Sequence, residues 1–106
     1  PEPGKNYNNA MCVEIDGDSM EPQLRKSERI LVRLIDPNDW EYLNPGVYAI
    51  AYWKRFTVKR MMKNTLFTAG HLELIADNPL RGSEVVKHAD IKAIWKVEAV
   101  LFRRVF

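Results

Sequence analysis

The sequence has little that supports cross-linking, cofactor binding or membrane insertion. It contains one cysteine, Cys12, which excludes an internal disulfide and is typical of a reducing compartment. No apolar run approaches the roughly 18 residues of a membrane-spanning helix, and no charged-then-apolar leader opens the chain. His71 and Glu73 share a predicted strand face, but two residues at this spacing are weak evidence for a metal site. We therefore expect a cytoplasmic protein with no membrane partner, no metal and no cofactor.

An excess of charge of one sign is also missing. The formal net charge is +2 at pH 7, and basic residues stand in scattered pairs such as Lys54-Arg55 and Arg103-Arg104. A domain that binds phosphates directly gathers its basic residues on one face. Direct binding of nucleic acid or a partner through these pairs is therefore a third, less favoured interpretation.

The length of 106 residues fits one domain with a substantial core. Residues 1–9 (PEPGKNYNN) contain proline, glycine, asparagine and charge, and cannot bury enough apolar surface to order themselves. We expect a linker remnant over residues 1–9, followed by a folded domain over residues 10–106. This composition favours the C-terminal domain of a longer protein.

Short apolar runs separated by turn residues predict a mostly β fold of bent, mainly antiparallel sheets with little helix. No segment keeps a helical apolar stripe over three turns. Residues 36–46 predict a loop, and Lys54-Arg55 a hairpin turn. The apolar segment 91–106 would be an exposed edge unless a two-fold partner covered it, which predicts a homodimer. The predicted strands span residues 10–15, 29–35, 47–53, 56–62, part of 66–75, 85–86 and 91–106.

A serine and a lysine are the residues best suited to catalysis. Ser19 lies in the turn-forming segment GDSMEP (residues 17–22), and Lys59 in the β-patterned segment FTVKR (residues 56–60). A serine hydroxyl needs a neighbouring base, and lysine is a base only when neutral, which apolar surroundings favour. We therefore predict Ser19 as the nucleophile and Lys59 as the general base. The residues alone also allow an ordinary turn serine and a solvated strand lysine.

Neighbouring residues have supporting roles in this hypothesis. Strand alternation places Thr57 on the face of Lys59, where its hydroxyl can orient the amine. The backbone amides of Asp18 and Ser19 can point to one spot and form an oxyanion site. Met20 holds the turn by packing, and the Asp18 side chain caps the turn rather than taking part in catalysis.

The remaining candidate residues have structural interpretations. Cys12 is expected to be a buried strand residue, because no histidine lies near it to activate the thiol. Trp40, Trp53 and Trp95 are expected to pack in the core or at a dimer seam.

The motifs GDSMEP (17–22), TVKR (57–60), LEL (72–74) and DNP (77–79), in this order, resemble the C-terminal domain of LexA-type and phage-repressor-type self-cleaving regulators and their UmuD-like relatives. The resemblance extends from residue 11 over nearly the whole chain. It implies a LexA/signal-peptidase-like fold and a homodimer, with the nucleophile and base roles on Ser19 and Lys59. It further implies a substrate in the protein's own linker, and DNA binding through an N-terminal domain outside this chain. An activated recombinase filament would be the stress signal.

The sequence departs from this pattern at a few places. Residues 25–28 read RKSE where the family often has Gly-Asp, and Trp95 stands where glycine is frequent. Pro3-Gly4 and Asn9-Ala10 are poor matches to a scissile dipeptide. Two alternatives stay open: a non-catalytic dimerisation or sensing domain with a vestigial dyad, and a signal-peptidase-type serine protease, which would need a membrane anchor.

Overall fold

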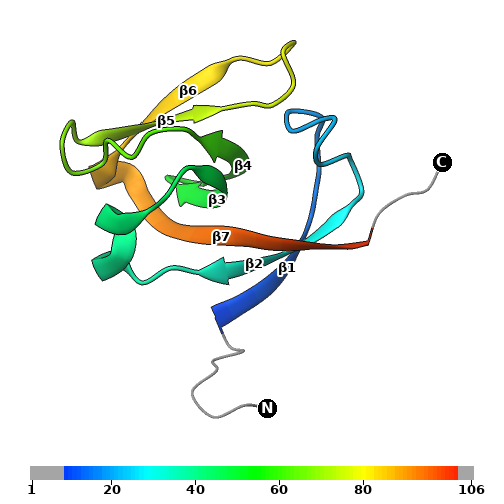
Figure 1. Cartoon of the computed structure of the whole chain (residues 1–106), viewed down its shortest axis with the longest axis horizontal. Coiled ribbons are helices and arrows are strands. Elements are labelled where there is room, and N and C mark those ends of the chain that lie inside the picture. The colour runs from blue at the N-terminus through cyan, green and yellow to red at the C-terminus, as the bar shows by residue number, and fades with distance from the viewer. Residues whose placement is uncertain (1–8, 103–106) are drawn as a thin grey trace.

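The structure, a computed structural model, describes residues 9–102. These residues form one antiparallel sheet in the order β1-β2-β7-β3-β4-β5-β6 (Figure 1). Short 3-10 helices lie at Pro37–Tyr42 and His88–Asp90. In this part of the chain no helix is long and apolar enough to cross a membrane. The strands are β1 (Ala10–Glu14), β2 (Arg29–Leu34), β3 (Gly46–Tyr52), β4 (Arg55–Met61), β5 (His71–Ile75), β6 (Ser83–Lys87) and β7 (Ile91–Phe102).

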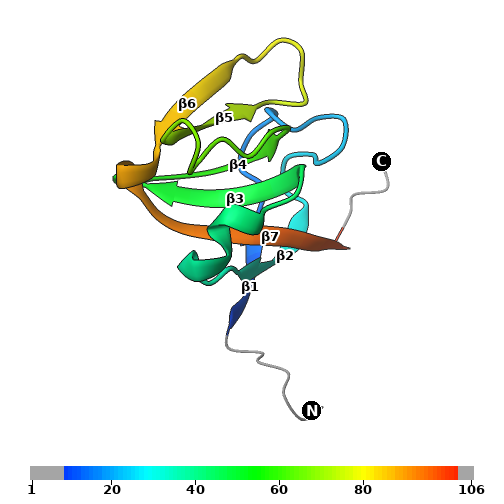
Figure 2. The ribbon, with the colours of Figure 1, turned by 60° about the vertical axis from the view of Figure 1, so that its left-hand side comes forward.

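The long strand β7 joins the two parts of the sheet. Its first half pairs with β3, where Ile94 lies opposite Ile50, and its second half pairs with β2, where Val100 lies opposite Ile30. The β2–β7 register shifts between Leu31 and Val32, an irregularity that bends a strand locally. Figure 2 shows the result, a strongly curved sheet with β7 running along it.

The curvature creates two hydrophobic clusters, on opposite sides of β3. Tyr48 and Ile50 belong to one cluster, and Ala49 to the other, as strand alternation requires. The Ile50 cluster contains Trp40, Tyr48, Ile50, Tyr52, Met61, Leu66, Leu72, Leu74, Val86, Ile91 and Ile94. The Ile30 cluster contains Ile15, Met20, Leu24, Ile30, Val32 and Ala49.

The mostly β fold predicted from the sequence is confirmed, with local differences. Residues 37–42 form a 3-10 helix rather than loop, because Pro37 opens it and the Asp36 carboxylate accepts a hydrogen bond from the Asn38 amide. The β3–β4 turn is at residues 53–54, one residue earlier than predicted, since Tyr52 pairs with Arg55. The segment 66–75, predicted as a hairpin arm broken near Gly70, forms a strand from His71 onward, directly after that break. Residues 1–8 of the predicted linker and 103–106 of the predicted last strand lie outside the described residues.

One burial prediction is wrong, and one tryptophan lies outside the core, where the predicted dimer seam stays its open alternative. Cys12 is exposed, because β1 is an edge strand and Val13, its neighbour, takes the position against the core. Trp53 is 59% exposed, because it occupies the β3–β4 turn. Trp40 is buried as predicted, and Trp95 is half-buried with its ring against that of Phe56.

Candidate functional site

The serine lies in a long loop between β1 and β2, which we call the Ser19 loop (residues 15–28). Backbone hydrogen bonds close its base, from the Ile15 amide to the Glu28 carbonyl and from the Ser27 amide to the Ile15 carbonyl, both 2.8 Å long. Met20, which is 1% exposed, inserts into the Ile30 cluster as predicted. Ser19 is therefore followed directly by the residue that anchors the loop.

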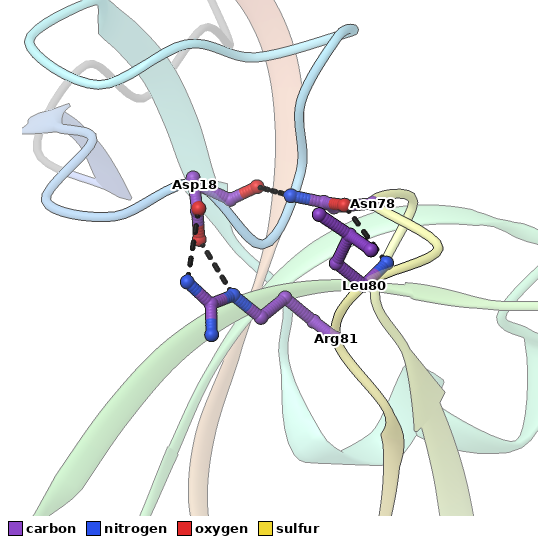
Figure 3. A network of polar contacts seen from close by, with 4 residues as sticks. All are labelled: Asp18, Asn78, Leu80 and Arg81. Atoms are coloured by element: carbon purple, nitrogen blue, oxygen red, sulfur yellow. Dashed lines mark hydrogen bonds and ion pairs between the residues drawn. The ribbon is translucent and has the colours of Figure 1, made fainter.

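A second segment, the β5–β6 connection (residues 76–82), holds this loop from the other side (Figure 3). Asn78 donates from its backbone amide to the Ser19 carbonyl (2.9 Å) and from its side chain to the Asp18 carbonyl (3.0 Å). Arg81 binds the Asp18 carboxylate through two hydrogen bonds of 2.8 and 3.0 Å. This guanidinium lowers the pKa of Asp18. The Asp18 side chain is thus an ion-pair partner of Arg81, and its role as a turn cap stays a prediction.

The lysine is positioned by regular strand pairing. Lys59 lies on β4 directly opposite Tyr48 of β3, on the face that carries Met61 into the Ile50 cluster. The amine is half-buried, and it donates a 2.7 Å hydrogen bond to the Thr57 hydroxyl. The contact between Lys59 and Thr57 is the one that strand alternation predicts.

Three influences act on the pKa of Lys59. Burial of the amine is the largest and lowers the pKa below its ordinary value. The Glu84 carboxylate acts in the opposite direction, and the Arg55 guanidinium adds a smaller lowering effect. The net direction is downward, as a lysine base requires.

Ser19 and Lys59 line the same cavity, although they are 40 positions apart in the sequence. This Ser–Lys cavity has a volume of about 260 Å³, and its remaining walls are residues 81–84. Within residues 9–102 no hydrogen bond joins the two side chains, and the hydrogen bond that the amine makes is to Thr57. No acidic side chain of the described residues lies within salt-bridge distance of the amine.

A smaller cavity of about 150 Å³ adjoins Ser19 on its other side. Its apolar wall comes from Val13 at the end of β1, Ile15 just after it, and Phe56 and Val58 of β4, and the carboxylate residues Glu14 and Asp16 also line it. Because Ser19 lines both cavities, a chain passing the serine would meet these mixed walls as well as the Ser–Lys cavity.

The backbone amide of Ser19 is available for a ligand, because in the described part of the chain it donates to no other group. The Asp18 amide is close to its own carboxylate and contributes to lowering the pKa of that group. The Asp18 carbonyl, in contrast, accepts from Glu21 and Asn78. The Asp18 carbonyl is therefore engaged while the Ser19 amide can donate to a bound group, and the oxyanion site formed by the two amides stays a prediction.

Three residues of the site were missed in the sequence, namely Asn78, Arg81 and Glu84. Asn78 stands in the DNP motif, which by itself indicates only a turn. Arg81 and Glu84 have no local signal, because their roles depend on a contact with the Ser19 loop or a shared cavity. His71 and Glu73 line another cavity, and no group of three metal-ligating side chains was found in the described residues.

The Ser19 loop also explains one departure from the family pattern. Ser27 has a left-handed backbone with φ of 74°, which glycine adopts more easily. Glu28 is completely buried, and its carboxylate accepts a 2.7 Å hydrogen bond from the Arg25 amide. Ser27-Glu28 therefore supplies the turn geometry and buried carboxylate for which Gly-Asp is suited.

Comparison with known proteins identifies the family of this chain. No curated protein matches the chain. The family model described as Peptidase S24-like matches residues 3–98, which is most of the chain. This is the family of LexA C-terminal, UmuD and phage-repressor domains. The chain therefore belongs to the Peptidase S24-like family.

Proposed function

We propose that this chain is the dimerisation and Ser–Lys autopeptidase domain of a LexA-like or phage-repressor-like transcriptional regulator. The observation that carries the proposal is the shared cavity of Ser19 and Lys59, together with a half-buried amine whose pKa is lowered by burial. Desolvation favours the neutral form of lysine, which can act as a base. A base next to a serine removes the hydroxyl proton and so makes the serine oxygen a nucleophile.

In the proposed reaction the neutral Lys59 amine takes the proton of the Ser19 hydroxyl while Oγ attacks the carbonyl carbon of the scissile peptide. The amides of Asp18 and Ser19 donate to the oxygen that becomes negative. Lys59 then gives its proton to the leaving amine, and water hydrolyses the acyl-serine through the same base. Thr57 orients the amine through its hydrogen bond.

The proposed substrate is a peptide bond in the protein's own linker. The cavity beside Ser19 would take an uncharged side chain next to that bond, because Val13, Ile15 and Phe56 give it an apolar wall. Glu14 and Asp16 also line it and would disfavour an acidic side chain. Cleavage would separate this domain from an N-terminal DNA-binding domain in the cytoplasm. An activated recombinase filament is the proposed stress signal, and a homodimer the proposed assembly.

Self-cleavage of the full-length protein tests the proposal. The rate should rise with pH until Lys59 is fully neutral and then level off. Ser19→Ala and Lys59→Ala should abolish the cut, and Lys59→Arg should fail as well because a guanidinium keeps its proton. Ser83→Ala, at an exposed residue of the same cavity, is the matched control and should still cleave.

A fluorophosphonate probe gives a readout that needs no scissile bond. Attack by Ser19 forms an Oγ–P bond and expels fluoride, while Lys59 takes the hydroxyl proton. The chain should be labelled on Ser19, and Lys59→Ala should prevent labelling.

A non-catalytic dimerisation domain with a vestigial dyad is the second candidate. One observation favours it, since the Lys59 amine bonds Thr57 and not Ser19. Three results together would decide for this candidate. The full-length protein would stay intact at pH ~10, the recombinase filament would not induce cleavage, and the fluorophosphonate probe would not label Ser19. Sedimentation tests the dimer in both cases, and a monomer at high micromolar concentration would contradict it.

A further inference from the structure

The Ser–Lys cavity contains a carboxylate that the proposed reaction does not use. Glu84 lies on β6 opposite Leu74 of β5, and both side chains therefore occupy the face of the sheet that carries the Ile50 cluster. The same face of β4 carries Lys59. Glu84 and Lys59 are thus directed into one cavity from two different strands.

The Glu84 side chain is held in place by a tyrosine. The Tyr52 hydroxyl donates a 2.8 Å hydrogen bond to Glu84 Oε1. Burial and this carboxylate raise the pKa of Tyr52 to about 12, so the hydroxyl stays a donor over the whole range in which Lys59 titrates. Glu84 is therefore a fixed charge at the wall of the cavity.

The other charged groups around Lys59 are paired or lie apart. Asp18 of the Ser19 loop and Arg81 of the β5–β6 connection bind each other. Arg55, on the strand of Lys59 itself, lies over the Tyr52 ring at 5.7 Å. Glu84 makes no salt bridge within the described residues. Of the two carboxylates among these groups, Asp18 and Glu84, it is Glu84 that has no direct cationic partner in the described part of the chain.

We propose that Glu84 is a positioning residue of the site that acts through Lys59: its carboxylate favours the ammonium form of the lysine and so restrains attack by Ser19 near neutral pH. A negative charge stabilises a nearby ammonium group, and the proton must leave before Lys59 can accept another from Ser19. The restraint on attack by Ser19 rests on the proposed function. The stabilisation of the Lys59 ammonium form by Glu84 does not.

The first experiment measures the lysine directly in the Ser19→Ala chain, which cannot react. An NMR titration of the Lys59 side chain should give a lower pKa in Glu84→Gln than in the parent, because the amide removes the charge and keeps an acceptor for Tyr52. Glu73→Gln, an exposed residue on β5, is the matched control and should leave the pKa of Lys59 unchanged. Tyr52→Phe keeps the carboxylate, and the pKa should not fall.

The second experiment follows fluorophosphonate labelling of Ser19 against pH. Near neutral pH, Glu84→Gln should be labelled about threefold faster or more than the unaltered chain, since the neutral fraction of a base below its pKa rises tenfold per pKa unit. The rise of the profile should move to lower pH. If Glu84 had only a structural role, Glu84→Gln would lower the labelling rate at every pH and would not shift the pH at which the rate rises.

The outcomes separate the two proposals. If the pKa of Lys59 does not fall in Glu84→Gln, or falls equally in Glu73→Gln, the role of Glu84 is overturned, whether or not Ser19 reacts. If the pKa falls but no variant is ever labelled or cleaved, the role of Glu84 stands and the peptidase function fails. If labelling occurs and its pH profile does not move, the proposed restraint is overturned.

Discussion

The nucleophile and the base of the candidate site are held in different ways. Lys59 lies within a strand in which every residue pairs with β3, so neighbouring backbone fixes its position. Ser19 lies in a loop whose position depends on buried side chains, of which Met20 adjoins the serine, and on hydrogen bonds to Asn78, 60 positions from Asp18. Strand geometry therefore places the base, while long-range contacts place the nucleophile.

Removing a buried methionine from each region should give the largest effects. Met20→Ala and Met61→Ala both empty a fully buried site, and each should lower the free energy of unfolding by about 2–5 kcal/mol. Only Met20→Ala should also slow probe labelling of Ser19 strongly, because the loop loses its anchor. Urea denaturation and labelling under native conditions check this. Equal loss of labelling in both variants would contradict the comparison.

Two asparagines with similar hydrogen bonds allow a finer test. Asn78 and Asn64 each donate to a distant backbone carbonyl and accept from the amide two residues later. Replacing either by alanine should cost about 1–3 kcal/mol, the penalty for unsatisfied polar groups. Labelling of Ser19 should fall in Asn78→Ala and stay normal in Asn64→Ala, which lies elsewhere in the fold. Normal labelling in both would show that Asn78 does not position the nucleophile.

The backbone of the Ser19 loop contains a strained residue whose release should stabilise the chain. Ser27→Gly should raise the free energy of unfolding by about 0.5 kcal/mol, because a left-handed conformation costs roughly 1–2 kcal/mol and glycine loses roughly 0.5–1 kcal/mol in entropy. Ser83→Gly, within β6, is the control and should destabilise. Thermal denaturation of both variants measures the sign, and a destabilised Ser27→Gly would contradict the account.

The exposed ion pair between Asp18 and Arg81 should have the smallest effect. Arg81→Gln should destabilise slightly, and less at high salt, because solvent screens exposed pairs. The pKa of Asp18 is lowered in the folded chain, so the contribution is present above the ordinary carboxyl pKa and is lost as pH falls through the lowered value. Denaturation of both proteins over acidic pH should therefore show the difference shrinking. If the difference in the free energy of unfolding between the parent and Arg81→Gln grew on acidification, the Asp18–Arg81 pair would be excluded as its source.

The same contrast explains what the sequence could predict. The strands, the shared face of Thr57 and Lys59, and the anchoring role of Met20 follow from local patterns. The single-residue shift of the β3–β4 turn shows the ordinary limit of such patterns, since Trp53 and Lys54 have no strong turn preference. Cys12 was misplaced because an edge strand alternates like an inner one while its outer face stays in solvent.

Asn78, Arg81 and Glu84 could not be predicted for a different reason. Each belongs to the site only because the β5–β6 connection and β6 reach the Ser19 loop and share a cavity with Lys59 of β4. This arrangement depends on the order of strands in the sheet, and strand order leaves no periodic signal in a sequence. Glu84 in particular has the alternation of an ordinary strand residue, and its relation to Lys59 exists only in three dimensions.

The β5–β6 connection has a consequence for changes of chain length. Surface connections usually accept insertions at little cost, because loop closure entropy grows slowly with length. Residues 76–82, however, hold the backbone of Ser19 at one point and lead directly into β6, which carries Glu84. An inserted residue would shift the hydrogen bond to the Ser19 backbone relative to Glu84 on β6. The segment therefore acts as a spacer of fixed length, and variation or engineering in this domain is better placed elsewhere, for example in the exposed β3–β4 turn.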